Sequence, residues 1–191
     1  MPDMSDQMPA ATAAVAVPYV YPLDALYAQA GLPLPRMEKI AAEQVPSPYH
    51  KLLVHNTDMT PTLEGFHGGP IHLKILQREQ RGDYYFRQVL LLLKGSEKPV
   101  EFGANKVSLL LFPPRARQLI LEEKMPLGSI LKQCDIAHST VAKAFFRVVP
   151  DELISGVLGL ANDQVLYGRK ATIFDPQKRP LSEIVEILPP A

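Results

Sequence analysis

Cysteine is almost absent from this sequence, since Cys134 is the only one among 191 residues. A single thiol cannot close an intramolecular disulfide, and it cannot supply the paired thiolates of a zinc cluster. A lone cysteine in an apolar-rich segment is more often a packing residue than a nucleophile. We therefore expect no disulfide and assign Cys134 to packing.

An excess of charge of either sign is absent too, because 20 basic side chains balance 20 acidic ones. This balance gives no support for a nucleic-acid partner. No apolar run approaches the about 18 residues of a membrane span. No basic residue precedes Arg36, although a secretory signal needs one near its start. We expect a cytoplasmic protein that binds neither nucleic acid nor membrane.

Recognisable metal and serine-hydrolase motifs are also missing. Four histidines lie on at least three predicted elements, without a His-Glu-x-x-His or comparable spacing: His50, His55, His67 and His72. The sequence contains no Gly-x-Ser-x-Gly turn of the kind that exposes a nucleophilic serine. It therefore predicts neither a metal site nor a serine triad.

The composition is typical of one globular domain, with 47% hydrophobic and 21% charged residues. Residues 1–17 are rich in alanine, methionine and proline and predict a loose tail. A short helix is expected over residues 22–30, and the proline-rich residues 31–48 predict an irregular arm laid over the core. We therefore divide the chain into an N-terminal tail and arm, residues 1–48, and a folded domain, residues 49–191.

Alternating apolar and polar residues over 71–77, and apolar segments bounded by turns elsewhere, predict the strands of the folded domain. They are expected over residues 71–77, 83–93, 99–111, 139–149, 166–174 and 181–188. Proline at the start and glycine at the end mark helices between them, which are expected over residues 49–54, 60–68, 113–124, 126–131 and 150–159. These elements predict an α+β fold with a single six-stranded antiparallel sheet and helices inserted between the strands.

One charged side chain interrupts a predicted core face in the strand over residues 83–93. Side chains two residues apart in a strand share a face, so Arg87 lies beside the apolar Val89 and Leu91. A buried guanidinium without a partner costs several kcal/mol. Arg87 must therefore meet either a carboxylate of the protein or a bound anion.

The last predicted strand carries two glutamates on opposite faces, Glu183 and Glu186. One of them therefore points the same way as the apolar side chains of the core. The residues alone leave two alternatives open. Arg87 forms a structural ion pair with Glu186 or Glu183, or it binds the carboxylate of a ligand in a pocket.

Several segments between residues 50 and 190 resemble, in the same order, the chorismate pyruvate-lyase family. The family has an Asp-Ser-Met-Thr-like turn after a Leu-rich helix, an aromatic-x-Arg-x-aliphatic strand, and a Pro-Leu-Gly that opens a helix. Its closing hairpin begins Tyr-Gly-Arg-Arg and ends with a Glu before Leu-Pro. The matching segments here are Thr57–Thr60, Tyr85–Leu90, Pro126–Gly128, Tyr167–Lys170 and Glu186–Pro189. The resemblance implies a chorismate lyase-like fold.

The resemblance also implies a reaction and a site. The family releases pyruvate from chorismate to leave 4-hydroxybenzoate, and it needs neither a metal nor an organic cofactor. By this resemblance Arg87 and the backbone amides of Met59 and Leu127 would hold the ring carboxylate, while Glu186 would lie at the hydroxyl end and handle a proton. We therefore expect a cofactor-independent carbon–oxygen lyase. Its catalytic residues would be Arg87 and Glu186, and its substrate-binding residues Met59, Arg87, Leu127 and Glu186.

The sequence departs from the family in two ways. The final hairpin is two residues longer, which keeps the parity of the last strand and favours Glu186 over Glu183 as the residue that faces the pocket. A second family arginine that follows a glycine is not matched after Gly103. Arg169 would be able to attract the second carboxylate of chorismate, although an arginine in a hairpin is more often a solvated charge. Two other functions stay open. The effector domains of one large group of bacterial transcription regulators share the lyase fold, so the chain would be a sensing domain for an aromatic carboxylate. The second open function is that of a related lyase, which makes another phenol for secondary metabolism.

Overall fold

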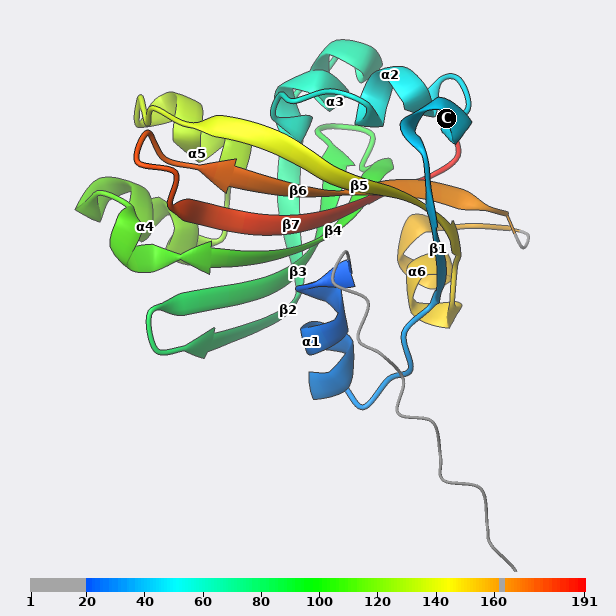
Figure 1. Cartoon of the computed structure of the whole chain (residues 1–191), viewed down its shortest axis with the longest axis horizontal. Helices are drawn as coiled ribbons and strands as arrows, with labels where there is room; N and C mark the ends of the chain where they lie inside the picture. Colours follow the sequence, from blue (N-terminus) through cyan, green and yellow to red (C-terminus); the bar gives the residue numbers. More distant parts are fainter. Residues whose placement is uncertain (1–19, 162–163) are drawn as a thin grey trace, which may run out of the picture.

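A computed structural model describes residues 20–161 and 164–191 of the chain (Figure 1). Within these residues seven strands form one open antiparallel sheet in the order β1-β5-β6-β7-β4-β3-β2. The strands are β1 (Arg36–Ile40), β2 (Ile71–Arg81), β3 (Tyr84–Leu93), β4 (Pro99–Ser108), β5 (Ser139–Val149), β6 (Leu166–Phe174) and β7 (Pro180–Leu188). The predicted α+β class with a single antiparallel sheet is confirmed, but the sheet has seven strands and not six.

The additional strand, β1, comes from the segment that we expected to be an irregular arm. It pairs with β5 at the edge of the sheet, from Arg36 opposite Val149 to Ile40 opposite Phe145. Ile40 is its only buried side chain, so β1 lacks the alternation that would predict a strand. Charged side chains are typical of such an exposed edge. The prediction of an irregular arm is therefore wrong for residues 36–40.

Six helices in the described parts of the chain cover both faces of the sheet. They are α1 (Leu23–Gln29), α2 (Tyr49–Leu53), α3 (Met59–His67), α4 (Pro114–Glu122), α5 (Leu127–Gln133) and α6 (Glu152–Leu158). Helices α1 and α6 pack on one face, and α2 to α5 pack on the other (Figure 1). Because both faces are covered, central strands such as β3 are buried along most of their length.

Several element boundaries differ from the prediction, among them the end of β2, which lies at Arg81 and not at residue 77. Helix α3 begins at Met59, so Asp58 and not Thr60 precedes its first turn. The Asp58 side chain accepts a hydrogen bond from Thr140 on β5, as described below. The third predicted strand ends at Ser108, because residues 109–111 form a 3-10 turn that leads into α4.

The hydrophobic core on the face of α2 to α5 is divided into two clusters. One joins α4 and α5 to sheet residues such as Val107 and Ile173. The other joins α2 and α3 to sheet residues such as Val89 and Leu91. Members of both clusters line a single cavity that also contains charged side chains. The division therefore places a polar cavity near the centre of this face of the sheet.

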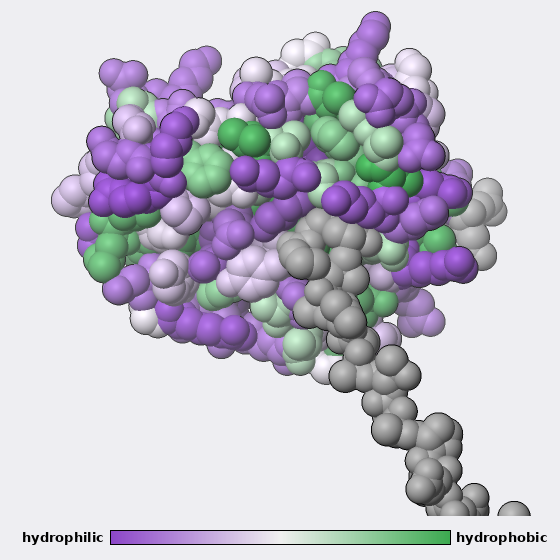
Figure 2. Space-filling model, in the orientation of Figure 1, coloured by the Kyte–Doolittle hydropathy of each residue, from purple (hydrophilic) through white to green (hydrophobic). Residues whose placement is uncertain are grey.

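The surface is mainly hydrophilic on the side seen in Figure 2, with hydrophobic side chains in small groups between the polar ones. Exposed large apolar residues such as Phe66 and Leu110 lie on different elements. None of the helices in residues 20–161 and 164–191 combines the length and the apolar character needed to cross a membrane.

Candidate functional site

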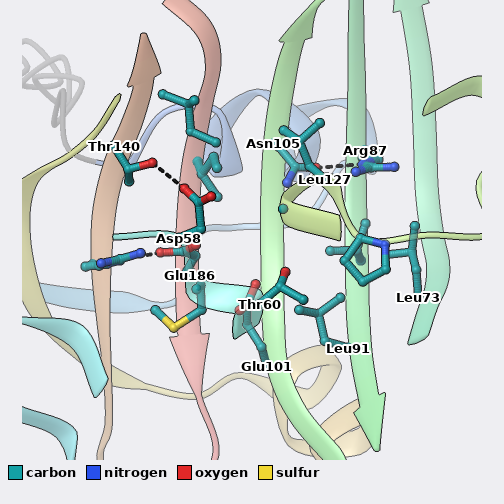
Figure 3. A pocket seen from close by; sticks show the side chains of 17 residues that line it. Asp58, Thr60, Leu73, Arg87, Leu91, Glu101, Asn105, Leu127, Thr140 and Glu186 are labelled. Carbon is teal, nitrogen blue, oxygen red and sulfur yellow. Dashed lines mark hydrogen bonds and ion pairs between the residues drawn. The ribbon is translucent and has the colours of Figure 1, made fainter. Parts of the chain in front are cut away.

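A cavity lies between the sheet and the N-terminal ends of α3 and α5 (Figure 3). Its volume of about 40 Å³ is room for about three water molecules. All the residues predicted to form the site line it: Met59, Arg87, Leu127 and Glu186. The structure therefore brings together four positions that are far apart in the sequence, and their individual roles stay predictions.

Arg87, on β3, is a buried cation without an ionic partner among the described residues. Its side chain is only 1% exposed. Nε donates a hydrogen bond to Oδ1 of Asn105 at 2.9 Å, whereas Nη1 is buried and has no hydrogen-bond partner. Burial lowers the pKa of Arg87 to about 10, so the guanidinium is still charged at neutral pH. Arg87 lines the cavity, so its wall contains a positive charge and a donor without a partner in the described chain.

The predicted structural ion pair of Arg87 is wrong for both glutamates. Glu186 forms an ion pair with Arg169. Glu183 lies on the opposite face of β7 and pairs with Lys106 and Lys170 at 3.5 and 3.4 Å. Parity along the last strand put the two glutamates on opposite faces, and the family resemblance favoured Glu186 for the cavity side, where the structure has it. Neither of them could tell which arginine the carboxylate meets. The second alternative therefore remains, in which Arg87 binds the carboxylate of a ligand in the cavity.

Arg169 is fully buried and not the solvated hairpin charge that we expected. Besides Glu186 it binds the loop that follows α2, because Nη1 donates to the carbonyl of His55 at 3.0 Å and Nη2 donates to the carbonyl of Thr57 at 3.1 Å. The prediction failed because β6 is an interior strand that this loop covers, and a strand pattern does not show which loop lies above it. Arg169 therefore fixes the loop and the Glu186 carboxylate together.

Glu101, on β4, is a site residue that the sequence analysis missed. Its side chain lines the cavity and is 4% exposed, and its Oε2 has no hydrogen-bond partner. Burial and the nearby Glu186 raise the pKa of Glu101 well above its ordinary value, although Arg169 opposes the shift. The signal was available, because period-two spacing puts Glu101 on the same face of β4 as Gly103 and Asn105. We applied that spacing to β3 and β7 but not to β4.

Met59 and Leu127 are the first residues of α3 and α5. The first N–H groups of a helix have no acceptor within it. The two helix ends are in close contact, because a Cβ on Gly128 would lie 3.1 Å from Oγ1 of Thr60. Both residues of this contact line the cavity.

A hydrogen-bonded group at the edge of the cavity joins α3 to the start of β5. Asp58 accepts from Oγ1 of Thr140, and its other oxygen lies 2.8 Å from Nε2 of His138 (Figure 3 shows the Asp58–Thr140 bond). Nδ1 of His138 lies 2.7 Å from the carbonyl of Ile136. Both ring nitrogens therefore face acceptors, which only the doubly protonated ring satisfies. Burial lowers the pKa of His138, but these two acceptors outweigh it and the net pKa is raised.

We expect this group to make the stability of the protein depend on pH. The pKa of His138 is higher in the folded state, so its contribution is fully present below about pH 6.5 and is lost as the pH rises through the folded pKa. The ring is partly exposed, so the loss should not exceed about 1 kcal/mol. Urea unfolding of the wild type and of His138→Gln at about pH 5.5 and about pH 8.5 checks this. An identical pH dependence in both proteins would contradict it.

The remaining histidines do not form a metal centre. His72 lies 2.9 Å from Glu97, and His55 lies 3.1 Å from a nitrogen of Arg169. Burial and that guanidinium lower the pKa of His55. In the part of the chain that the structure describes, no three His, Cys, Asp or Glu side chains are grouped so that they would hold a metal ion.

Comparison with known proteins identifies the fold and not a family. No family model matches the sequence, and no curated protein matches it at a significant level. A structure of a gene product from Staphylococcus aureus is similar, with 6% identity and a TM-score of 0.52 over 72% of this chain and 90% of that chain. The effector domain of PhnF from Mycobacterium smegmatis is 12% identical, with a TM-score of 0.54 over 69% of this chain and 87% of that domain. In a longer PhnF structure, with a TM-score of 0.53, the match covers 63% of that chain.

Identities this low establish the fold alone. The shared architecture is the chorismate lyase-like α+β fold that the sequence predicted. The membership of this chain in the chorismate pyruvate-lyase family stays a prediction, and so does its reaction.

Proposed function

We propose that this chain binds a small aromatic carboxylate in the cavity, with Arg87 as the group that holds the carboxylate. The observation that carries the proposal is the buried Nη1 of Arg87, which has no partner among the described residues. A ligand carboxylate would accept from Nη1 and would offset the buried charge, a geometry for which guanidinium is well suited. Asn105 supports it, because its Oδ1 is used by Arg87 and its amide NH₂ is left to donate.

The walls of the cavity suit a ring. About half of the residues that line it are apolar, including Leu73, Val89, Leu91, Leu127, Ile173 and Ile184, and small-molecule sites typically combine such walls with a few polar groups. A benzoate is larger than the present cavity, so its entry requires α3 and α5 to move apart at the contact between Thr60 and Gly128. The name of one fold neighbour, the effector domain of PhnF, fits a role in binding and sensing a ligand.

The second candidate function is the lyase reaction that the resemblance implies. The bond between the ring carbon and the enolpyruvyl oxygen would break, the ring would lose a proton as it becomes aromatic, and the enolpyruvate would gain one to become pyruvate. The observation that favours it is a pair of buried carboxyl groups in the cavity, Glu101 and Glu186. Carboxylate binding alone requires neither, whereas proton transfer requires at least one.

Two measurements on the wild-type protein test these functions. Calorimetric titration with 4-hydroxybenzoate is expected to give saturable binding, and incubation with chorismate in EDTA-treated buffer, followed by a pyruvate assay, detects turnover. Binding without pyruvate release supports the sensing function, and release of pyruvate supports the lyase. If the protein neither binds 4-hydroxybenzoate nor consumes chorismate, the proposal is wrong.

A further inference from the structure

Glu101 lies in the proposed pocket in a position that a glycine makes possible. Its Oε1 would be 2.8 Å from a Cβ on Gly103, so any larger residue at 103 would push the carboxyl away. Gly103 is directly opposite Glu186 in the pairing of β4 with β7. The carboxyl of Glu101 therefore leans along its own strand toward Glu186, and Figure 3 shows both groups at the cavity.

The charges around Glu101 leave it without a cation of its own. The ionisable groups that line the cavity with it are Asp58 on the N-terminal side of α3, Arg87 on β3, Arg169 on β6 and Glu186 on β7. Arg169 is already bound to Glu186 and to two loop carbonyls. Glu101 forms no ion pair with any described residue, and a second buried anion beside Glu186 would cost several kcal/mol. Glu101 is therefore favoured as a neutral acid, in agreement with the direction of its pKa.

A neutral carboxylic acid has an O–H donor, which an ionised carboxylate lacks. Oε2 of Glu101 is buried and makes no hydrogen bond within the described chain, so this oxygen is available to a ligand. Arg87 pairs with Asn105, two residues along β4 from Gly103. Successive residues of a strand are about 3.4 Å apart, and Asn105 lies opposite Arg87 in the sheet. The Glu101 carboxyl, which lies over Gly103, is therefore roughly 7 Å along β4 from the position opposite Arg87. This carboxyl is thus displaced along β4 from Arg87, so the two side chains would meet different parts of a ligand in the cavity.

We infer that Glu101 donates a hydrogen bond to the ligand at a point away from its carboxylate, and so selects aromatic acids that carry a second oxygen acceptor on the ring. This inference rests on the proposed function, since it concerns the ligand of the same pocket. It gives Glu101, and not only Glu186, a role at the hydroxyl end. Arg87 recognises the acid that all such ligands share, and Glu101 distinguishes among them.

Binding of two probe ligands to three proteins tests the inference. The ligands are 4-hydroxybenzoate and benzoate, which lacks the para oxygen, and the proteins are the wild type, Glu101→Gln and Glu101→Leu. Glutamine retains a donor, so Glu101→Gln should keep the preference for 4-hydroxybenzoate. Leucine has none, so Glu101→Leu should bind 4-hydroxybenzoate about 10- to 100-fold more weakly and bind benzoate nearly as the wild type does. As the pH rises through the folded pKa of Glu101, the preference should fall in the wild type but not in Glu101→Gln.

Infrared difference spectra supply a readout that a structural role would not move. The wild type should show a carbonyl band of a protonated carboxylic acid that is missing in Glu101→Gln and that shifts when 4-hydroxybenzoate binds. An equal preference in the wild type and Glu101→Leu, or a wild-type spectrum without this band, would overturn the inference while leaving the proposed function standing. Failure of the wild type to bind either acid would overturn both.

Discussion

Replacing Arg87 with methionine is expected to weaken binding of 4-hydroxybenzoate by at least about 30-fold and to leave the unliganded protein at least as stable as the wild type. Loss of a buried charged hydrogen-bonding partner should cost roughly 2–5 kcal/mol of binding free energy, or about 30- to 4,000-fold in affinity. Stability should not fall, because Arg87 makes one hydrogen bond, to Asn105, and no ion pair within the described chain. Methionine fills a similar volume and removes the uncompensated charge.

Calorimetry and thermal unfolding separate this expectation from a purely structural role of Arg87. A matched control is Arg147→Met on β5, whose side chain is 48% exposed and pairs with Glu38 at the surface. It should change neither affinity nor stability by more than about 1 kcal/mol. Near wild-type affinity in Arg87→Met, together with a lower melting temperature, would show that Arg87 supports the fold and does not hold the ligand.

The fold was predictable where side-chain patterns report burial. The strands β2 to β7 lie in segments that alternation or apolar runs between turns predicted, and α3 to α6 begin near prolines or acidic caps. β1 was missed because an edge strand is defined by backbone pairing, and only Ile40 is buried. Such a strand forms because a neighbouring strand offers free N–H and C=O groups, and the residues of the edge strand itself do not reveal this.

For the candidate site, the sequence could predict which face of a single strand a charged residue occupies, but not which residue of another strand it contacts. Parity put Arg87 toward the core, parity together with the family resemblance favoured Glu186, and the structure places both at the cavity. Their partners depend on the order of the strands, which the sequence does not give: β4 places Asn105 opposite Arg87, and β6 places Arg169 opposite Glu186. The loop that covers Arg169 is likewise a product of the whole fold. The sequence therefore identifies charged residues that need partners more readily than it identifies the partners.

Replacing Arg169 with methionine is expected to destabilise the protein by about 3–5 kcal/mol, because it strands the buried carboxylate of Glu186. For a domain of this size such a loss lowers the melting temperature by roughly 6–20 °C. The variant also frees the carbonyls of His55 and Thr57 from their shared donor. Thermal unfolding at neutral pH measures the effect.

Two effects contribute to the loss of stability in Arg169→Met: the stranded charge of Glu186 and the lost hydrogen bonds to the loop of His55 and Thr57. A double variant and a lower pH distinguish them. In the double variant Arg169→Met/Glu186→Gln no charge is stranded, so we expect it to recover most of the stability and to retain only the deficit from the loop. Lowering the pH should act in the same direction on Arg169→Met alone, because protonation of the stranded Glu186 removes its charge. Arg179→Met is the matched control: Arg179 also pairs with a carboxylate, Asp175, but its side chain is 57% exposed, so the loss should stay below about 1 kcal/mol. A double variant no more stable than Arg169→Met would assign the whole effect to the loop, and Arg169 would then act as its anchor and not as the counter-charge of Glu186.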